Sequence, residues 1–276
     1  MSRLPVRPLT HLARSIRTLR AKLSRPERLL IYLSRGGLAV CVVKGGFRPV
    51  VRMKAILTVA TLDCDDTHGV TAALGALTEW LNVHPIRGAI EWVVGIDYVR
   101  YLLLPWDERL SSRPFCHTLA AALFAQQFSG SDISFSAYQL RFARLAFGRP
   151  RLTALIPTEL LSELNEFASR HHCRSRQITP ALSVVWDSLF ARVKNDAGVL
   201  ALVEGQRLLR VSYDRGQFTS ISIQPFSEER TPVIPSDITN LFPSRNITAP
   251  TGEESALQGP ISGDEARFAY ALCGVL

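Results

Sequence analysis

The chain has 276 residues, of which 47% are hydrophobic and 20% charged, which excludes a disordered or fibrous protein. A chain of this length buries about 75% of its unfolded surface and needs no disulfide or metal to hold a core. Its net charge of +8 is unevenly placed: residues 1–54 hold 13 basic residues and one acid, and the rest holds 19 basic and 23 acidic residues. The composition therefore argues against a basic body that grips phosphates.

Cysteine usage and hydropathy indicate the compartment. The number of cysteines is odd, no two form a C-x-x-C pair, and this pattern is typical of a reducing environment. We find no apolar run of the ~18–20 residues that a spanning helix needs, and no secretory signal in the first thirty residues. We therefore expect a soluble protein with at most peripheral membrane contact.

Residues 9–23 are predicted to form an amphipathic helix, because leucine and isoleucine recur at three-four spacing. Its basic face carries Arg14, Arg17, Arg20 and Lys22. Such a helix can lie on anionic lipid or in a partner's groove. An ordinary helix packed on the body with a solvated basic face explains the pattern equally well, and an organelle transit peptide is a weaker alternative. Residues 1–28 contain no aromatic residue, which argues against single-stranded nucleic acid as partner.

After Pro26 the pattern changes to short strands. Residues 29–34, 38–44 and 50–62 are β-rich and are separated by Arg35-Gly36-Gly37 and by Gly45-Gly46, which is typical of tight antiparallel turns. A helix over 67–81 and strands over 91–96 and 99–104 follow. A three-strand meander, a helix and a further strand predict an RNase H-like or actin-like α/β fold.

The second half repeats this opening. The middle is predicted as helices over 115–128, 158–171 and 180–193 with strands over 132–139, 141–147, 151–156 and 176–178. Strands over 199–204, 207–213 and 217–224 then form a second meander about 170 residues after the first, which indicates a pseudo-duplicated fold. Residues 225–262 hold six of the sixteen prolines and are expected to be a loop, and a helix over 264–276 closes the chain. We predict a basic helix at 1–28, a first subdomain at 29–150 and an abbreviated second subdomain at 151–276.

Three passages within residues 29–276 carry a resemblance to a known family. They are Trp-Val-Val-Gly-Ile-Asp-Tyr-Val-Arg-Tyr-Leu-Leu-Leu-Pro-Trp at 92–106, the helix and glycine-turn hairpin at 178–226, and Glu-Ala-Arg-Phe-Ala-Tyr-Ala-Leu-Cys-Gly-Val-Leu at 265–276. This arrangement resembles the actin-like ATPase superfamily, in the branch of the PilM protein of type IV pilus assembly and the cytoplasmic domain of type II secretion protein L. The resemblance implies an α/β, RNase H-like fold with two pseudo-duplicated subdomains and mixed sheets.

The phosphate loops of that family are altered here. Actin-like ATPases hold phosphates with two Asp-x-Gly hairpins, whose backbone N–H groups cradle oxygens while the aspartate reaches the metal or its waters. The first turn, Ser34-Arg35-Gly36-Gly37, has no acid. The second has Val203 at the aspartate position and Glu204 one place late before Gly205, and a shift of one residue is expected to turn the side chain to the opposite face. We therefore predict a degenerate cleft with no cofactor, no metal and no catalytic residue.

Other chemistries find less support. A nuclease of the RNase H type needs an acid on the first strand, which is missing, although Glu79 and Asp97 stand at plausible places. There is no P-loop, no dinucleotide fingerprint and no nucleophile elbow. Three further clusters are better explained by helix ends than by metal binding or nucleophilic catalysis: Asp63, Asp65 and Asp66; His171, His172 and Cys173; Cys116 and His117.

The resemblance implies a function and a partner class. It predicts a non-catalytic cytoplasmic scaffold, peripheral to the inner membrane, in a bacterial pilus-assembly or type II secretion-like machine. Its partner would be the cytoplasmic tail of an inner-membrane assembly protein, docked as an extended peptide in a groove between subdomains, or the motor ATPase. We expect no nucleic-acid partner. Two alternatives stay open: an active actin-like or sugar-kinase-like ATPase, and a peripheral membrane-surface adaptor.

Overall fold

The structure is a computed structural model that describes residues 27–45, 49–59, 66–129, 133–226, 237–244 and 263–273. The predicted basic helix with Arg14, Arg17, Arg20 and Lys22 lies outside these residues, as does most of the predicted loop over 225–262. Within the described ranges, no helix is long and apolar enough to cross a membrane.

The first sheet has five strands and begins with the predicted meander. β1 (Glu27–Ser34), β2 (Gly37–Lys44) and β3 (Val50–Thr58) are antiparallel neighbours, whereas β4 (Ala89–Val94) runs parallel to β1 and β8 (Arg174–Pro180) runs parallel to β4. The strand order is β3-β2-β1-β4-β8. The parallel strands therefore all point their carboxyl ends toward one end of the sheet.

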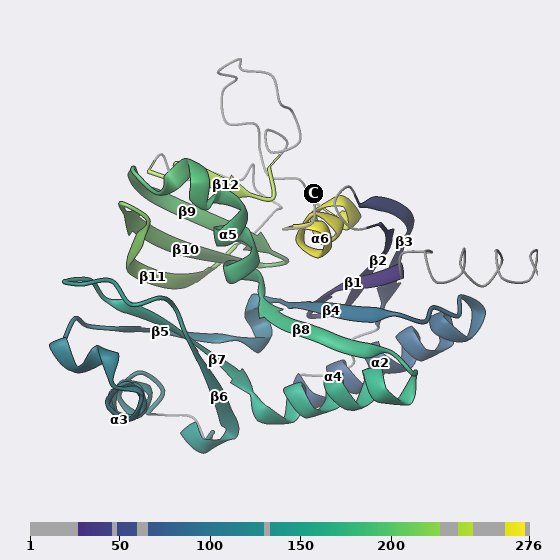
Figure 1. Cartoon of the computed structure of the whole chain (residues 1–276), viewed down its shortest axis with the longest axis horizontal. Helices are drawn as coiled ribbons and strands as arrows, with labels where there is room; N and C mark the ends of the chain where they lie inside the picture. The colour runs from purple at the N-terminus through teal and green to yellow at the C-terminus, as the bar shows by residue number, and fades with distance from the viewer. Residues whose placement is uncertain are drawn as a thin grey trace, which may run out of the picture.

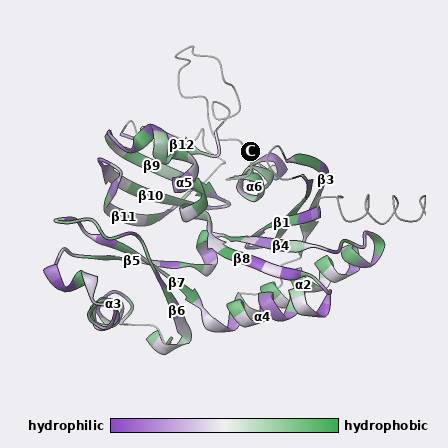
Figure 2. Cartoon of the chain, viewed as in Figure 1, coloured by the Kyte–Doolittle hydropathy of each residue, from purple (hydrophilic) through white to green (hydrophobic). Residues whose placement is uncertain are grey.

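Helices cover both faces of this sheet. α2 (Asp66–Val83) and α4 (Thr158–Arg170) lie along one face, and α6 (Gly263–Leu272) lies on the other (Figure 1). The edge of the Phe167 ring in α4 packs on Trp92, with ring centroids 5.9 Å apart, while Tyr270 of α6 stacks on Tyr32. Because both faces are covered, β1 and β2 are almost continuously apolar and buried. In Figure 2, α2 and α4 each carry both hydrophobic and hydrophilic residues, as expected for helices at the surface.

The second sheet repeats the layout of the first. β9 (Ala197–Glu204), β10 (Arg207–Asp214) and β11 (Gln217–Pro225) form an antiparallel meander, and the short β12 (Asn240–Phe242) runs parallel to β9. The order β11-β10-β9-β12 matches β3-β2-β1-β4 in both sequence and direction. The predicted pseudo-duplication is therefore confirmed. α5 (Ala181–Val193) packs against this sheet through Trp186, which contacts Tyr213 and Phe218.

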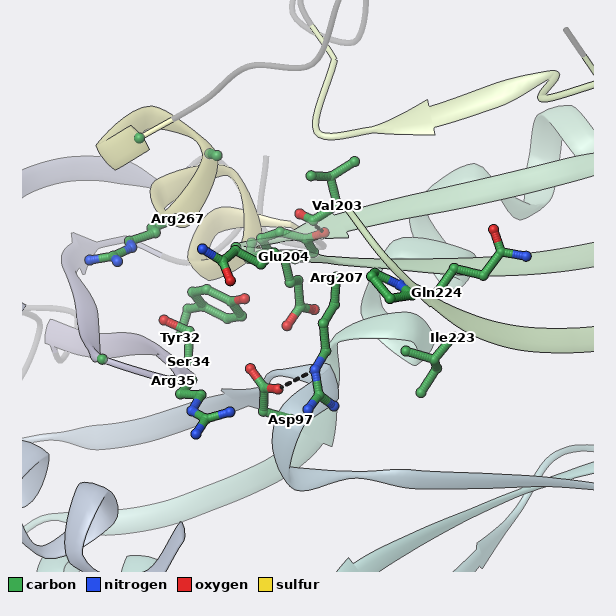
Figure 3. Close-up of a pocket in the computed structure, with 17 residues that line it drawn as sticks. Tyr32, Ser34, Arg35, Asp97, Val203, Glu204, Arg207, Ile223, Gln224 and Arg267 are labelled. Carbon is green, nitrogen blue, oxygen red and sulfur yellow. Dashed lines mark hydrogen bonds and ion pairs between the residues drawn. The ribbon is translucent and has the colours of Figure 1, made fainter. Parts of the chain in front are cut away.

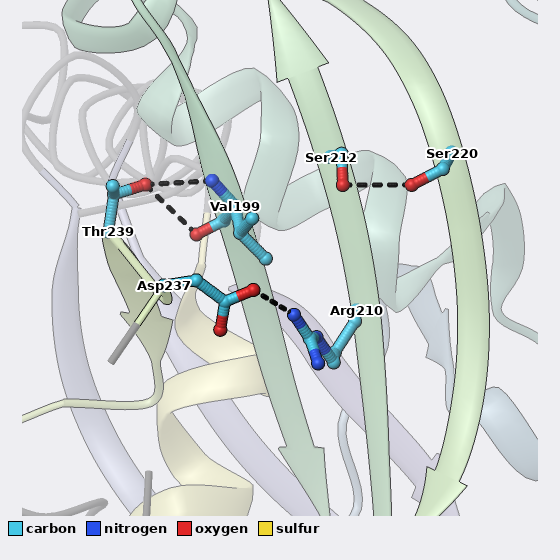
Figure 4. Close-up of polar contacts among 6 residues, drawn as sticks. All are labelled: Val199, Arg210, Ser212, Ser220, Asp237 and Thr239. Atoms are coloured by element: carbon cyan, nitrogen blue, oxygen red, sulfur yellow. Dashed lines mark hydrogen bonds and ion pairs between the residues drawn. The ribbon is translucent and has the colours of Figure 1, made fainter. Parts of the chain in front are cut away.

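Polar contacts hold β12 and the outer strands of the second sheet in place (Figure 4). The Thr239 hydroxyl accepts a hydrogen bond from the Val199 N–H at 2.9 Å and donates one to the Val199 carbonyl at 3.0 Å. Asp237 forms an ion pair with Arg210 of β10. The Ser220 hydroxyl of β11 donates to that of Ser212 in β10 at 2.8 Å. The bonds of Thr239 and Asp237 anchor the short strand β12, whose three residues form few ladder hydrogen bonds of their own.

A small third sheet forms a separate lobe. β5 (Arg100–Leu104), β7 (Arg151–Pro157) and β6 (Tyr138–Phe142) pair in the order β5-β7-β6. α3 (Arg113–Gln127) covers one face and forms an apolar cluster with it around Leu102, Cys116, Phe124 and Leu155. Three short 3-10 turns, η1 (Ile96–Tyr98), η2 (Glu108–Ser111) and η3 (Phe135–Ala137), connect these elements.

Three differences from the predicted elements stand out. The strands predicted over 132–139 and 141–147 are one short strand, β6, preceded by η3, because the apolar residues there pack around Phe124 and not in a longer ladder. β12 lies within the predicted loop. The predicted boundary at residue 150 separates strands that the structure pairs, since β7 joins β5 and β6, and β8 completes the first sheet.

Candidate functional site

A cleft of about 970 Å³ lies between the first two sheets (Figure 3). The turn between β1 and β2 and the turn between β9 and β10 both reach it, and α6 contributes a third wall. Its lining is polar and aromatic and includes Tyr32, Asp97, Arg207, Arg267 and Tyr270. It lies beyond the carboxyl ends of β1 and β4, where ligands bind in open α/β sheets.

The structure brings both altered phosphate turns to this cleft. Ser34, Arg35 and Gly36 line it from the first turn, and Glu204 and Gly205 line it from the second. Gly37 is not among the lining residues, although it pairs with Ser34 at the start of β2. Residues from the two halves of the sequence therefore meet at one site, as the pseudo-duplicated fold requires.

The expected orientation of Glu204 is wrong. The Glu204 side chain points into the cleft, where its Oε2 accepts a hydrogen bond from the Ile96 N–H at 2.7 Å. Val203, at the predicted aspartate position, also lines the cleft and packs in an apolar cluster with Leu208 and Ile238. The alternation of side chains along β9 holds, but it is Glu204 that faces the first sheet. An acid is therefore present in the second turn.

Burial gives this acid an unusual charge state. Glu204 is 5% exposed, and burial, reinforced by nearby Asp97, raises the pKa of its carboxyl group to about 8. Hydrogen bonds from the Ile96 N–H and the Tyr32 hydroxyl oppose this shift only in part. Within the described residues, Oε1 has no hydrogen-bond partner. At neutral pH the group is therefore a largely protonated, neutral acid.

A glycine makes room for this carboxyl group. A Cβ atom at Gly95, which precedes Ile96, would lie 2.6 Å from Glu204 Oε2 and 3.0 Å from the Leu33 carbonyl oxygen. The Gly95 N–H also donates to that carbonyl at 2.8 Å. The close approach of β9 to the ends of β1 and β4 thus depends on the missing side chain.

Two tyrosines beside Glu204 connect the first sheet to the second. The rings of Tyr32 in β1 and Tyr270 in α6 stack with centroids 4.7 Å apart and planes inclined by 17°. The Tyr270 hydroxyl donates to the carbonyl of Val203 in β9 at 2.9 Å. Burial raises the pKa of both phenols well above the ordinary value, so they stay neutral hydrogen-bond donors. α6 therefore ties the first sheet to the second.

The second carboxylate of the cleft is held by an arginine. Asp97 Oδ1 lies 3.0 Å from Arg207 Nε, and the side chains are 13% and 44% exposed (Figure 3). This ion pair links η1, which follows β4 of the first sheet, to β10 of the second sheet. The sequence marks Asp97 as a candidate nuclease acid, but no sequence signal links it to Arg207.

Sequence analysis does not identify Tyr32 and Tyr270 as residues of the site, because both lie in apolar segments and look like ordinary core residues.

The other candidate clusters have structural roles. His171 Nε2 lies 3.3 Å from Thr78 Oγ1, and Cys173 Sγ donates to the Ile86 carbonyl at 3.4 Å. Cys116 Sγ donates to the Leu110 carbonyl at 3.1 Å. Among the residues that the structure describes, no group of three or more His, Cys, Asp or Glu could hold a metal. Asp63 and Asp65 lie outside those residues.

A second cavity, which we call the α5 groove, has a volume of about 550 Å³. It lies between the β6–β7 hairpin, α5 and the turn before β11. Its apolar lining includes Phe142, Leu152, Trp186, Phe190 and Phe218, of which Phe190 is 42% exposed. Exposed Arg141, Arg144 and Asp187 also line it. The groove therefore offers an apolar floor with a basic side.

Comparison with solved structures identifies the fold. The chain is similar to the PilM–PilN type IV pilus biogenesis complex, with a TM-score of 0.52 and 13% identity over 74% of this chain and 62% of that chain. It is also similar to the cytoplasmic domain of EpsL, an inner-membrane component of the type II secretion system of Vibrio cholerae, with a TM-score of 0.48 and 9% identity over 72% and 71%. A Bacteroides thetaiotaomicron protein with an actin-like ATPase fold gives a TM-score of 0.46 and 14% identity over 75% and 74%.

At 13% identity, the likeness to the PilM–PilN structure supports the predicted resemblance at the level of the fold alone. Of the three, the PilM–PilN structure exceeds a TM-score of 0.5. The chain spans less than two thirds of the PilM–PilN chain that it matches. No protein-family model and no curated protein matches the sequence.

Proposed function

We propose that this protein is a non-catalytic cytoplasmic scaffold of a pilus-assembly or type II secretion-like machine. The observation that carries the proposal is the burial of Glu204, the acid of the second turn, which accepts a hydrogen bond from the Ile96 N–H at 2.7 Å and whose pKa burial raises to about 8. The similarity to the PilM–PilN complex supports the class of machine. Both features fit an actin-like fold that has kept its architecture for binding a protein.

The chemistry of the cleft argues against Mg-nucleotide binding. A magnesium ion with its phosphates prefers charged oxygen ligands, and a protonated carboxyl group is a poor one. Ionising Glu204 would require a charge in a site where burial already disfavours it. Asp97, the other carboxylate, is engaged with Arg207. Among the residues that the structure describes, the cleft therefore has no acid that is both charged and free of a basic partner.

Calorimetric titration of Mg-ATP into the full chain tests this proposal against the ATPase alternative. We expect no binding heat at millimolar nucleotide. Micromolar binding, or phosphate release that disappears in Asp97→Asn, would overturn the non-catalytic proposal and favour an active ATPase. The same titration with ATP and EDTA separates metal-dependent binding from simple attraction of the triphosphate to arginines.

We place the partner's tail in the α5 groove. Its apolar floor suits one or two aliphatic or aromatic anchors, and Arg141 and Arg144 suit a neighbouring acidic residue. β6 is the edge strand of its sheet, so an extended peptide can also pair with its backbone. A short extended tail would use both features.

A pull-down with cytoplasmic tails of inner-membrane pilus and secretion components tests the groove. Phe190→Asp should weaken capture at least tenfold, because it puts a charge on the apolar floor. Phe147→Asp is the matched control, since Phe147 is 88% exposed in the β6–β7 turn and does not line the groove. Equal loss in both variants would argue against the groove. Failure of all tails and of the motor ATPase to bind would remove the proposed function and leave the fold.

A further inference from the structure

One end of the first sheet is rich in exposed basic side chains. This end lies opposite the cleft and gathers the starts of β1, β3, β4 and β8 and the end of β2, because of the strand directions. Six basic residues lie there with two acids, Glu27 and Glu91. We call the basic set the cationic edge: Arg28, Lys44, Arg52, Arg87, Arg174 and Arg176.

Contacts between the strands show that these residues form one surface. Glu91 Oε1 lies 3.2 Å from Arg28 Nη1 and 3.0 Å from Arg176 Nη1, so one carboxylate in β4 is shared by arginines of β1 and β8. Arg52 of β3 forms an ion pair with Glu27 of β1 at 2.5 Å. The Arg174 N–H donates to the Gly88 carbonyl at 2.9 Å, which fixes Arg174 beside the loop that carries Arg87. The cationic edge therefore crosses all five strands.

The charge on this surface is not balanced by its own acids. Both acids are used in the ion pairs just described, and they leave an excess of four positive charges among these eight residues. Lys44, Arg87 and Arg174 are exposed and take no part in those ion pairs. Residues 1–26 join the molecule here, at the start of β1, and add seven basic residues and no acid.

Exposed aliphatic side chains accompany the charge. Val50, paired with Lys44 at the start of β3, is 64% exposed, and Val83 at the end of α2 is 73% exposed. Basic side chains beside exposed apolar ones suit the boundary between lipid headgroups and acyl chains. The six side chains of the cationic edge include no aromatic ring on which a base could stack, which disfavours single-stranded nucleic acid.

We propose that the cationic edge docks this protein on an anionic membrane surface, with the cleft directed away from the lipid. Basic residues within a Debye length of a charged leaflet each add to the attraction, and salt weakens it. This orientation keeps the cleft, at the far end of the sheet, accessible to the cytoplasm. The proposal does not depend on which partner occupies the α5 groove, so each can fail alone.

Co-sedimentation of the full chain with vesicles tests it. We expect binding to phosphatidylcholine vesicles that contain about 30 mol% phosphatidylglycerol at about 0.1 M salt, and loss of binding without the anionic lipid or at about 0.5 M salt. Changing Lys44, Arg87 and Arg174 to glutamate should reduce partitioning at least tenfold. The matched control changes Arg109, Arg113 and Arg192 to glutamate, three exposed arginines outside the cationic edge and the α5 groove, and should bind within about twofold of wild type.

Equal loss in the two triple variants would overturn the proposal, because total charge and not the cationic edge would then set the affinity. Wild-type partitioning of the edge variant would also overturn it and assign all binding to residues 1–26. Binding of duplex DNA with the same dependence on the edge, without vesicle binding, would assign the surface to nucleic acid instead. If the glutamate variant unfolds in thermal denaturation, the same three positions changed to glutamine provide the test, with a smaller expected loss of about threefold or more.

Discussion

The two hairpin turns that face each other across the cleft differ in what surrounds their glycines. In the first, a Cβ atom at Gly37 would lie 2.3 Å from the Leu57 carbonyl oxygen of β3. In the second, Gly205 has φ +54°, and a Cβ atom added there would meet nothing within 4 Å. The first glycine is required by a neighbouring strand and the second only by its left-handed backbone. The first turn is thus part of a packed layer, and the second borders open space.

The two turns also differ in whether they carry an acidic residue. The first turn has none, whereas the second places Glu204 against the end of β4 as a buried hydrogen-bond acceptor. The acid of the second turn therefore contributes to the contact between the first and the second sheet. Stability measurements on single variants test this difference between the two turns.

The largest effect is expected from Gly37→Ala. The new methyl group would meet the backbone of β3, which has no flexible side chain to move aside, so we expect a loss of about 3 kcal/mol or more. Gly205→Ala should lose only about 1 kcal/mol, the cost of a left-handed backbone for a residue with a Cβ. Urea unfolding of both variants measures the difference. Equal losses would show that the two turns are equally packed.

Glu204→Gln should change the pH dependence of stability by roughly 2–4 kcal/mol. The pKa of Glu204 rises from 4.5 to about 8 on folding, so the folded chain holds a proton that the unfolded chain releases between these values. Its contribution to stability is complete below about pH 4.5 and falls as pH rises to about 8. The variant cannot ionise and should lack this decline.

Free energies of unfolding at about pH 5 and about pH 8.5 measure this effect. Glu79→Gln, at an exposed position of α2, is the control and should keep the wild-type decline. A parallel decline in wild type and Glu204→Gln would mean that the buried acid is already ionised, and would weaken the proposed loss of catalysis.

Tyr270→Phe should cost about 1–2 kcal/mol, because it keeps the ring stack with Tyr32 but removes the buried donor to the Val203 carbonyl. Thermal unfolding measures the loss. A neutral result would show that the ring and not the hydroxyl joins α6 to the second sheet.

Arg207→Ala should have the smallest effect, at most about 1 kcal/mol and decreasing with added salt, because its ion pair with Asp97 is partly exposed. Arg35→Ala, in the first turn, serves as the comparison and should change stability by less than about 0.5 kcal/mol. A larger loss of stability in Arg35→Ala would mean that the Arg35 side chain makes a stabilising contact in the first turn.

Much of the fold was predictable because its signals are local. Glycine turns between apolar runs mark both meanders, and amphipathic spacing marks α4, whose buried residues include Leu160, Leu164 and Phe167. β12 was missed because three residues carry no periodicity, and it is held mainly by Thr239 and Asp237. The boundary at residue 150 stays a prediction, and the place of β8 beside β4 depends on a crossover that no local pattern encodes.

The sequence predicts which residues form the two turns of the cleft, but it does not predict how their side chains are oriented. The two turns could be matched by their glycines, but the direction of Glu204 depends on which face of β9 meets the first sheet, and that is a tertiary property. The Asp97–Arg207 pair and the Tyr32–Tyr270 stack join residues far apart in sequence. Neither residue type nor spacing distinguishes them from ordinary core and surface residues.

The place of α6 has a consequence for how the chain folds. Tyr32 lies in the first described strand and Tyr270 in the last described helix, yet their rings stack on the first sheet. During synthesis, at about 5–20 residues per second, the face of β1 and β2 that α6 covers stays open until residues 263–272 have emerged. Contacts of such large sequence separation also slow folding. The nascent first sheet therefore has an exposed apolar face for much of translation, and a chaperone is best placed to protect it there.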